Sequence, residues 1–112
     1  MQITQSMLAP EIPNPHGVSV RKLHDTEHAQ VNLVTLQPGE ALKLHVTPVD
    51  VFFYVVAGEG TVQIGDEREV VSSGALIASP ARIPHRLLNE GEGVFQVLVV
   101  KTPRPTSSTR IL

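Results

Sequence analysis

The feature that most constrains this chain is a series of short β-prone runs separated by turn residues. The runs cover residues 18–23, 29–36, 51–57, 61–64, 69–71, 75–78, 85–88 and 94–101, and Gly, Pro or Asp stands between most of them. No segment of any length shows the spacing of apolar residues that marks an amphipathic helix. Regular short strands with turn signals between them are typical of an all-β sandwich or barrel. We therefore predict an all-β fold with no helix longer than about two turns.

The chain is short enough to form one domain. With 112 residues, it can bury roughly 60 to 70 % of its unfolded surface and so keep a real core. Residues 1–17 contain Pro10, Pro13 and Pro15, which remove backbone donors, so this part is predicted to be an extended arm. Residues 18–101 hold the strands, and residues 102–112 have the composition of a flexible tail.

Composition excludes several classes of function. Nine Lys and Arg face eleven Asp and Glu, which gives a net charge of -2 with no basic cluster, so nucleic acid is not an expected partner. There is no cysteine, which removes disulfides and thiolate sites. The first residues lack a signal-peptide pattern, and no apolar run approaches the roughly 20 residues that span a membrane. We expect a soluble cytoplasmic protein.

Two spaced motifs in the chain resemble those of the cupin family. The first motif of that family has a glycine, histidines, a glutamate and a closing glycine; the second has a glycine, a proline, a histidine and an asparagine. At the family spacing, this chain has Gly39, His45 and Gly58 in the first motif and Gly74, Pro80, His85 and Asn89 in the second. The resemblance covers about residues 31–101 and implies a cupin-type jelly-roll β-barrel.

The resemblance also implies a metal site, from which this chain departs at two positions. In metal-binding cupins the histidines and the glutamate hold one divalent transition metal, such as zinc, iron, manganese or nickel. Here His45 and His85 match two of those ligands, whereas Thr47 stands at the second histidine and Val51 at the glutamate. Asp50, one residue earlier, is the first candidate for a third ligand. A strict strand turns Asp50 outward, and a bend after Pro48 could undo that.

Without a metal, His45 and His85 are predicted to be hydrogen-bonded pocket histidines, with Thr47 and a water between them. The alternation of strand side chains places Thr47 on the same face as His45. The same rule puts Val51, Phe53 and Val55 on one face, and this face makes the pocket wall partly apolar if it lines the barrel. Small, partly apolar ligands fit such a wall.

Two further groups of charged or titratable residues are considered for the site. Arg82, in the loop before His85, is a cation that could receive a carboxylate or phosphate at the pocket mouth, and an exposed loop arginine is the alternative. His16, His24 and His28 lie in loop segments and are predicted to be surface residues.

Two classes of function remain open for a chain of this kind. One is a metal-dependent enzyme acting on a small carbonyl or sugar-like substrate, with His45 and His85 as metal ligands. The other is a small-molecule binding or sensing protein that uses the barrel without a metal and without turnover. We also expect a homodimer in which the arm before Gly17 and the tail after Lys101 pack on a neighbouring subunit.

Overall fold

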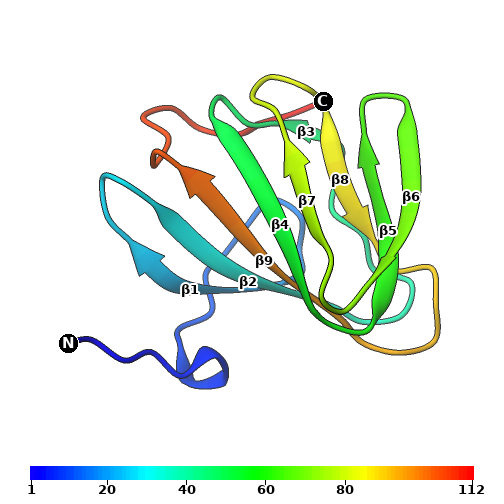
Figure 1. Ribbon diagram of the computed structural model, residues 1–112, viewed down its shortest axis with the longest axis horizontal. Helices are drawn as coiled ribbons and strands as arrows, with labels where there is room; N and C mark the ends of the chain where they lie inside the picture. Colours follow the sequence, from blue (N-terminus) through cyan, green and yellow to red (C-terminus); the bar gives the residue numbers. More distant parts are fainter.

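Two five-stranded antiparallel sheets face each other in the computed structural model of the protein, which describes residues 1–112 (Figure 1). The first sheet has the strand order β1-β2-β9-β4-β7 and the second has β10-β3-β8-β5-β6. The strands are β1 (Ser19–Asp25), β2 (Gln30–Leu36), β3 (His45–Val46), β4 (Asp50–Ala57), β5 (Glu59–Ile64), β6 (Glu67–Ser72), β7 (Leu76–Ser79), β8 (His85–Leu88), β9 (Phe95–Thr102) and β10 (Arg110–Ile111).

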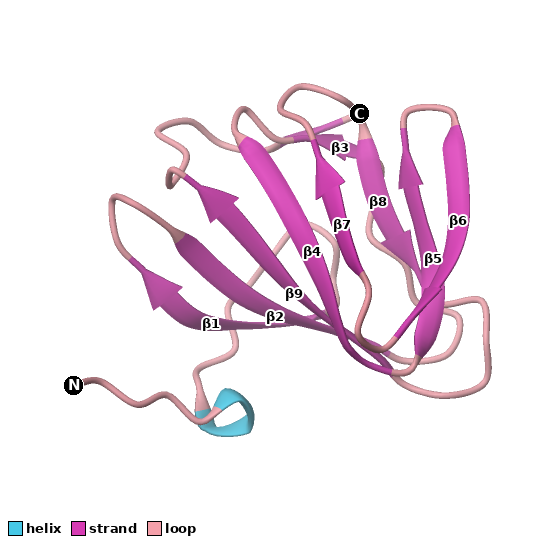
Figure 2. Ribbon diagram, in the orientation of Figure 1, coloured by secondary structure: helices cyan, strands magenta, loops and turns pink.

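The all-β prediction is confirmed. The only helical element is a single 3-10 turn, η1 (Ser6–Leu8), near the amino terminus, and strands dominate the rest of the chain (Figure 2). Every run predicted to be a strand forms one, with bounds that differ by at most two residues. The chain forms no helix with the length and hydropathy needed to cross a bilayer.

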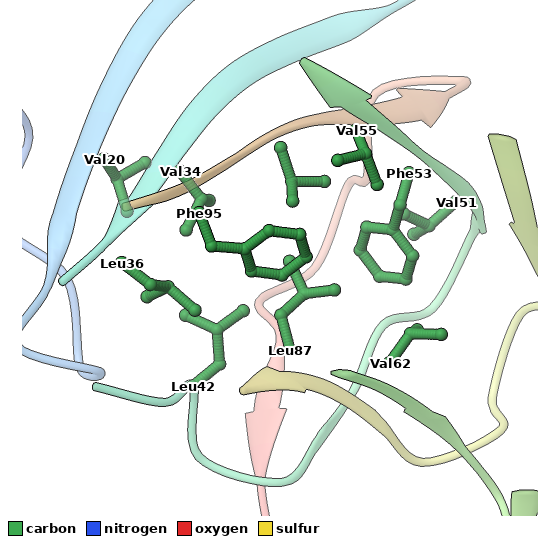
Figure 3. Packing of buried hydrophobic residues seen from close by; sticks show 11 residues of the cluster. Val20, Val34, Leu36, Leu42, Val51, Phe53, Val55, Val62, Leu87 and Phe95 are labelled. Atoms are coloured by element: carbon green, nitrogen blue, oxygen red, sulfur yellow. The ribbon is translucent and has the colours of Figure 1, made fainter. Parts of the chain in front are cut away.

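The core lies between the two sheets and is built from alternate residues of the strands. In β4, Val51, Phe53 and Val55 are buried, whereas Tyr54 and Val56 are exposed. Side chains two residues apart on a strand point to the same face, so this pattern gives β4 one inner and one outer face. Phe95 and Leu87 pack with this inner face in a cluster of eleven buried residues (Figure 3).

The carboxy-terminal tail differs from the prediction of a flexible segment. Its last residues form β10, in which Arg110 pairs with Val46 and Ile111 pairs with His45. The amide of Leu112 also donates a hydrogen bond to the carbonyl of Leu44 at 3.0 Å. The tail is therefore held by its own chain, beside the strand that carries His45. Composition alone did not predict this, because a two-residue strand leaves no pattern and its pairing partner is distant in sequence.

The amino-terminal arm contains the turn η1 and then runs beside β1, at the edge of the first sheet. The amide of Ile12 donates to the carbonyl of Val20 at 2.9 Å, and the guanidinium of Arg21 donates to the carbonyl of Ala9 at 2.7 Å. The side-chain amide of Asn14 donates to the carbonyls of Ile12 and Val18. These bonds fix the arm on β1 and place His16, two residues after Asn14, toward the inside of the barrel.

Candidate functional site

A cavity of about 240 Å³ lies between the sheets, at the end of the barrel where β2, β4 and β8 begin and β9 ends. In Figure 1 this end, where β4 and β8 begin, is on the upper side of the view. Apolar side chains form much of its wall, among them Val20, Val34, Leu42, Val51, Phe53 and Val99. Its polar lining comes from both sheets, the arm and the tail: Asn14, His16, Gln30, Asn32, His45, Thr47, His85, Lys101 and Thr109.

The register of the first sheet arranges its cavity residues in rows. Lys101 on β9 lies between Gln30 on β2 and Val51 on β4. Two residues further into the barrel, Val99 lies between Asn32 and Phe53 in the same way. Because residues directly opposite across a sheet share a face, each row presents its side chains together. The outer row carries the charge, and the wall becomes more apolar with depth.

The second sheet brings His45 and His85 together across one strand pairing. These two residues are direct partners of β3 and β8, and their ring centroids lie 4.6 Å apart. Both side chains are buried, and so is that of Thr47. The ring of Phe53 from the first sheet packs edge-on against His85, with centroids 5.3 Å apart. Residues chosen from the motif spacing therefore do meet inside the barrel.

A third histidine, His16, joins this pair through the backbone of Lys43. The carbonyl of Lys43 can only accept, so His45 Nδ1, 2.7 Å away, carries the proton. The amide of Lys43 can only donate, and it lies 2.9 Å from His16 Nδ1, so that nitrogen accepts the hydrogen bond and carries no proton. The neutral rings therefore leave an acceptor, Nε2, on His45 and a donor, Nε2–H, on His16. The two ring centroids are 4.8 Å apart.

Both ring nitrogens of His85 are engaged by hydroxyl groups. Nε2 lies 3.1 Å from Thr47 Oγ1, and Nδ1 lies 2.6 Å from Ser79 Oγ. Ser79 and Thr47 are both buried, so neither hydroxyl is free to turn toward bulk water. One hydroxyl donates to the neutral ring and the other accepts from it. This arrangement holds His85 rigidly and leaves it no lone pair for another partner.

Burial keeps the three imidazoles neutral. It lowers the pKa of His85 from 6.5 to about 3, and electrostatic repulsion from His45, Lys101 and His16 adds to the effect. Burial likewise lowers the pKa of His16 to about 4, with His45, Lys43 and Lys101 contributing. The pKa of His45 is lowered by burial and partly restored by its bond to the Lys43 carbonyl. At neutral pH the histidines therefore present hydrogen-bonding groups without charge.

The structure places the other predicted site residues outside the cavity. Asp50 is exposed, and its carboxylate accepts the amide of Ala81 at 2.8 Å, so the strict alternation of β4 turns it outward. Arg82 is also exposed, in a loop where its amide donates to the carbonyl of Thr47, and it lies beside the tail. His24 and His28 are exposed, as predicted. Thr47, Val51 and Phe53 line the cavity.

The residues present do not fit a transition metal. Catalytic zinc usually takes three protein ligands, and non-haem iron takes two histidines and a carboxylate. Of the three imidazoles here, His45 alone keeps a free lone pair, since those of His16 and His85 are used within the chain. No group of three or more His, Cys, Asp or Glu side chains in the chain is arranged to hold a metal ion. The prediction of Asp50 as a third ligand is therefore not supported by its position.

Sequence reasoning missed His16 and Lys101 as cavity residues and Ser79 as a hydrogen-bond partner of His85. Lys101 had a signal in the sequence, because Phe95, Val97, Val99 and Lys101 alternate along one face of a single strand. Ser79 pairs with Val51 and shares its inward face, which only the register of β7 on β4 reveals. His16 had no such signal, because an extended arm has no repeating face. It was predicted to be a surface residue, and the fold of the arm makes it half-buried instead.

Two antiparallel sheets enclosing a polar-ended cavity define a small, single-domain double-stranded β-helix. Residues 32–101 match the family model described as a cupin domain, and the chain belongs to the cupin family. An uncharacterised protein of Methanocaldococcus jannaschii is 30% identical over 87 residues, which are 77% of this chain and 75% of that protein.

Solved structures agree with this assignment. The TT1209 protein of Thermus thermophilus is 33% identical with a TM-score of 0.81, covering 94% of this chain and 100% of that one. The polyketide cyclase RemF of Streptomyces resistomycificus is 19% identical with a TM-score of 0.85, covering 100% and 85%. A predicted oxalate decarboxylase of Thermotoga maritima is 20% identical with a TM-score of 0.78, covering 99% and 100%. At such low identity the last two are evidence for the fold alone.

Proposed function

We propose that this protein is a metal-independent cupin that binds one small, partly apolar molecule in the barrel cavity. The observation that carries the proposal is the pair of neutral imidazoles at the cavity, His16 with a donor nitrogen and His45 with an acceptor nitrogen, both without a partner in the chain. A few placed polar groups over an apolar wall are the usual composition of a small-molecule site. The cavity volume of about 240 Å³ favours a ligand smaller than a drug-sized molecule.

The alternative, a metal-dependent enzyme on a small carbonyl or sugar-like substrate, has weaker support. Cupins often bind metals, and structural neighbours of this chain include a cyclase, a lyase and a predicted decarboxylase. In this chain, however, hydroxyl groups hold both nitrogens of His85, and Thr47 and Val51 replace two family ligands. The donor set therefore favours binding without a metal over metal-dependent turnover.

Binding in the cavity should survive removal of metals. We expect neutral probes, cyclopentanone and isovaleramide, to shift the backbone amide NMR signals of cavity residues such as Val99 and Leu42, equally with and without EDTA. The imidazoles supply hydrogen bonds that need no ion. A matched variant, His45→Phe, fills the site without the acceptor nitrogen and should weaken the binding of isovaleramide. Shifts that vanish in EDTA, or that map only to the outer surface, would contradict the proposal.

We also propose a homodimer, through the outer face of the first sheet rather than through the tail. Phe52 and Tyr54 on β4 lie opposite Val100 and Leu98 on β9, and Tyr54 lies opposite Leu76 on β7. Tyr54 is 39% exposed and Leu76 is 61% exposed, and Phe52, Leu98 and Val100 beside them are half-buried, so apolar groups of three adjacent strands lie together on this face. Contiguous apolar surface of this kind is typical of an interaction site. A second copy of the chain would cover it.

Sedimentation should therefore show a species of about twice the 12.1 kDa chain at micromolar concentration. Replacing Leu76 with lysine places a charge within the proposed interface and should yield the monomer, because an unpaired charge is costly to bury. Val70, which is 66% exposed on the other sheet, provides the control, and Val70→Lys should stay dimeric. Wild-type protein that sediments only as the single chain would exclude the dimer.

A further inference from the structure

Lys101 is a cation at the cavity that the proposed function has not yet used. It lies near the end of β9, on the inward face shared with Val97 and Val99, and it lines the cavity. The three imidazoles of His16, His45 and His85 line the same cavity, and the charge of Lys101 lowers the pKa of each. The strand alternation, and not a flexible loop, fixes its direction. The fold of β9 therefore positions Lys101 at the polar end of the cavity.

No group in the chain neutralises this ammonium. None of the seventeen residues lining the cavity is Asp or Glu. Lys101 takes part in none of the five ion pairs in the chain, which involve Arg21, Lys22, His28, Arg68 and Arg104. Burial lowers its pKa, which reflects the unfavourable removal of the charge from water. A half-buried lysine without a counter-ion loses part of its hydration, and an anionic ligand would compensate for that loss.

A second unsatisfied group lies next to Lys101. The Oδ1 atom of Asn32 is buried and has no hydrogen-bond partner. Asn32 lies two residues from Gln30, the direct partner of Lys101, so the two side chains are diagonal neighbours on one face. Diagonal neighbours in an antiparallel pair are about 7 to 8 Å apart, which is within reach of a long side chain such as lysine. Buried polar atoms in native proteins are normally paired, and an amide oxygen can only accept, so this atom needs a donor such as the Lys101 ammonium and not a carboxylate.

We propose that the ligand is a small aliphatic monocarboxylate, with Lys101 as the counter-ion of its carboxylate and the Asn32 Oδ1 atom as a second acceptor for the Lys101 ammonium. This inference rests on the proposed function and specifies its ligand. The carboxylate lies in the row of Gln30, Lys101 and Val51, and the hydrocarbon body extends toward Val99 and Phe53. A phosphate fits less well, because its charge of up to about -2 and its three acceptor oxygens require more than one cation.

The test compares two probes of the same shape and different charge. Isovalerate and isovaleramide are titrated into the wild-type protein at pH 7, with amide NMR shifts of cavity residues as the readout. We expect isovalerate to bind at least about tenfold more tightly, since hydrogen bonds and ion pairs with a charged partner are the stronger ones in a partly dry site. Inorganic phosphate should bind more weakly than isovalerate.

Two lysine variants test whether Lys101 causes the preference for isovalerate over isovaleramide. Lys101→Met keeps the length of the side chain and removes the charge, so the preference for isovalerate should disappear while isovaleramide still binds. Lys22→Met is the control, because Lys22 pairs with Asp25 at 3.1 Å and does not line the cavity. It should keep the preference. Asn32→Leu removes the acceptor beside the Lys101 ammonium and should weaken isovalerate binding severalfold. Thermal unfolding verifies that each variant is folded.

The outcomes separate the two proposals. If isovaleramide binds in the cavity as tightly as isovalerate, the carboxylate inference is wrong and the proposed function stands. If neither probe nor cyclopentanone shifts cavity signals at millimolar concentration, both proposals fail. If Lys101→Met retains the preference, another group binds the anion and the role of Lys101 is disproved.

Discussion

Replacing Gly58 with alanine should destabilise the protein more than the same substitution at any other turn glycine. Gly58 lies between β4 and β5 and has a φ of 81°, in the left-handed region, where a residue with a side chain loses about 1 to 2 kcal/mol. An added Cβ would also overlap the backbone carbonyl oxygen of Val94, which cannot move without shifting the loop before β9. We expect a total loss of about 4 kcal/mol or more.

Gly74 separates the two causes. It has a φ of 94°, but a Cβ there would meet no atom within 4 Å. Gly74→Ala should therefore lose only the conformational part, about 1 to 2 kcal/mol. Chemical denaturation of both variants gives the free energies of unfolding. Equal losses at the two positions would show that the contact with Val94 relaxes freely and that backbone conformation alone makes this glycine necessary.

Much of the fold could be predicted from the sequence because each strand carries its own signal. In β4 the alternation that buries Val51, Phe53 and Val55 is visible in the letters, and a turn residue follows each strand. Pairing partners are different, because they depend on residues far apart in the chain. The β10 strand consists of two residues, and its place beside β3 is decided by the edge that β3 leaves free. No local pattern could reveal it.

The candidate site was predicted only where motif spacing constrains it. His45, His85 and Thr47 were expected to meet, and the register of β3 on β8 brings them together. Asp50 was assigned a role that needed a bend after Pro48, but β4 begins at Asp50 itself and turns the carboxylate to the surface. Arg82 lies in a loop, where the spacing of the motif residues does not determine the direction of a side chain. The charge of the cavity is supplied instead by Lys101, from a strand outside both motifs.

Lowering the pH below about 6.5 should destabilise the folded protein through its buried histidines. Burial lowers the pKa of His85 to about 3, whereas an imidazole in the unfolded chain takes up a proton near 6.5. Between these values the unfolded chain binds more protons than the folded one, so the free energy of unfolding falls as the pH falls. At pH 5, His85 alone should cost about 2 kcal/mol. His16, whose pKa is about 4, acts in the same direction but less strongly, because it is partly exposed.

The matched variant His85→Gln isolates this contribution. Glutamine can still bond to the hydroxyls of Thr47 and Ser79, but it does not titrate, so the loss of stability between pH 7 and pH 5 should shrink by about 2 kcal/mol. His24 is exposed on β1, and His24→Gln should leave the loss of stability between pH 7 and pH 5 unchanged. Denaturation at several pH values gives these slopes directly. An equal loss of stability in wild type and His85→Gln would mean that His85 takes up its proton in the folded barrel, and burial could not then be what keeps the ring neutral.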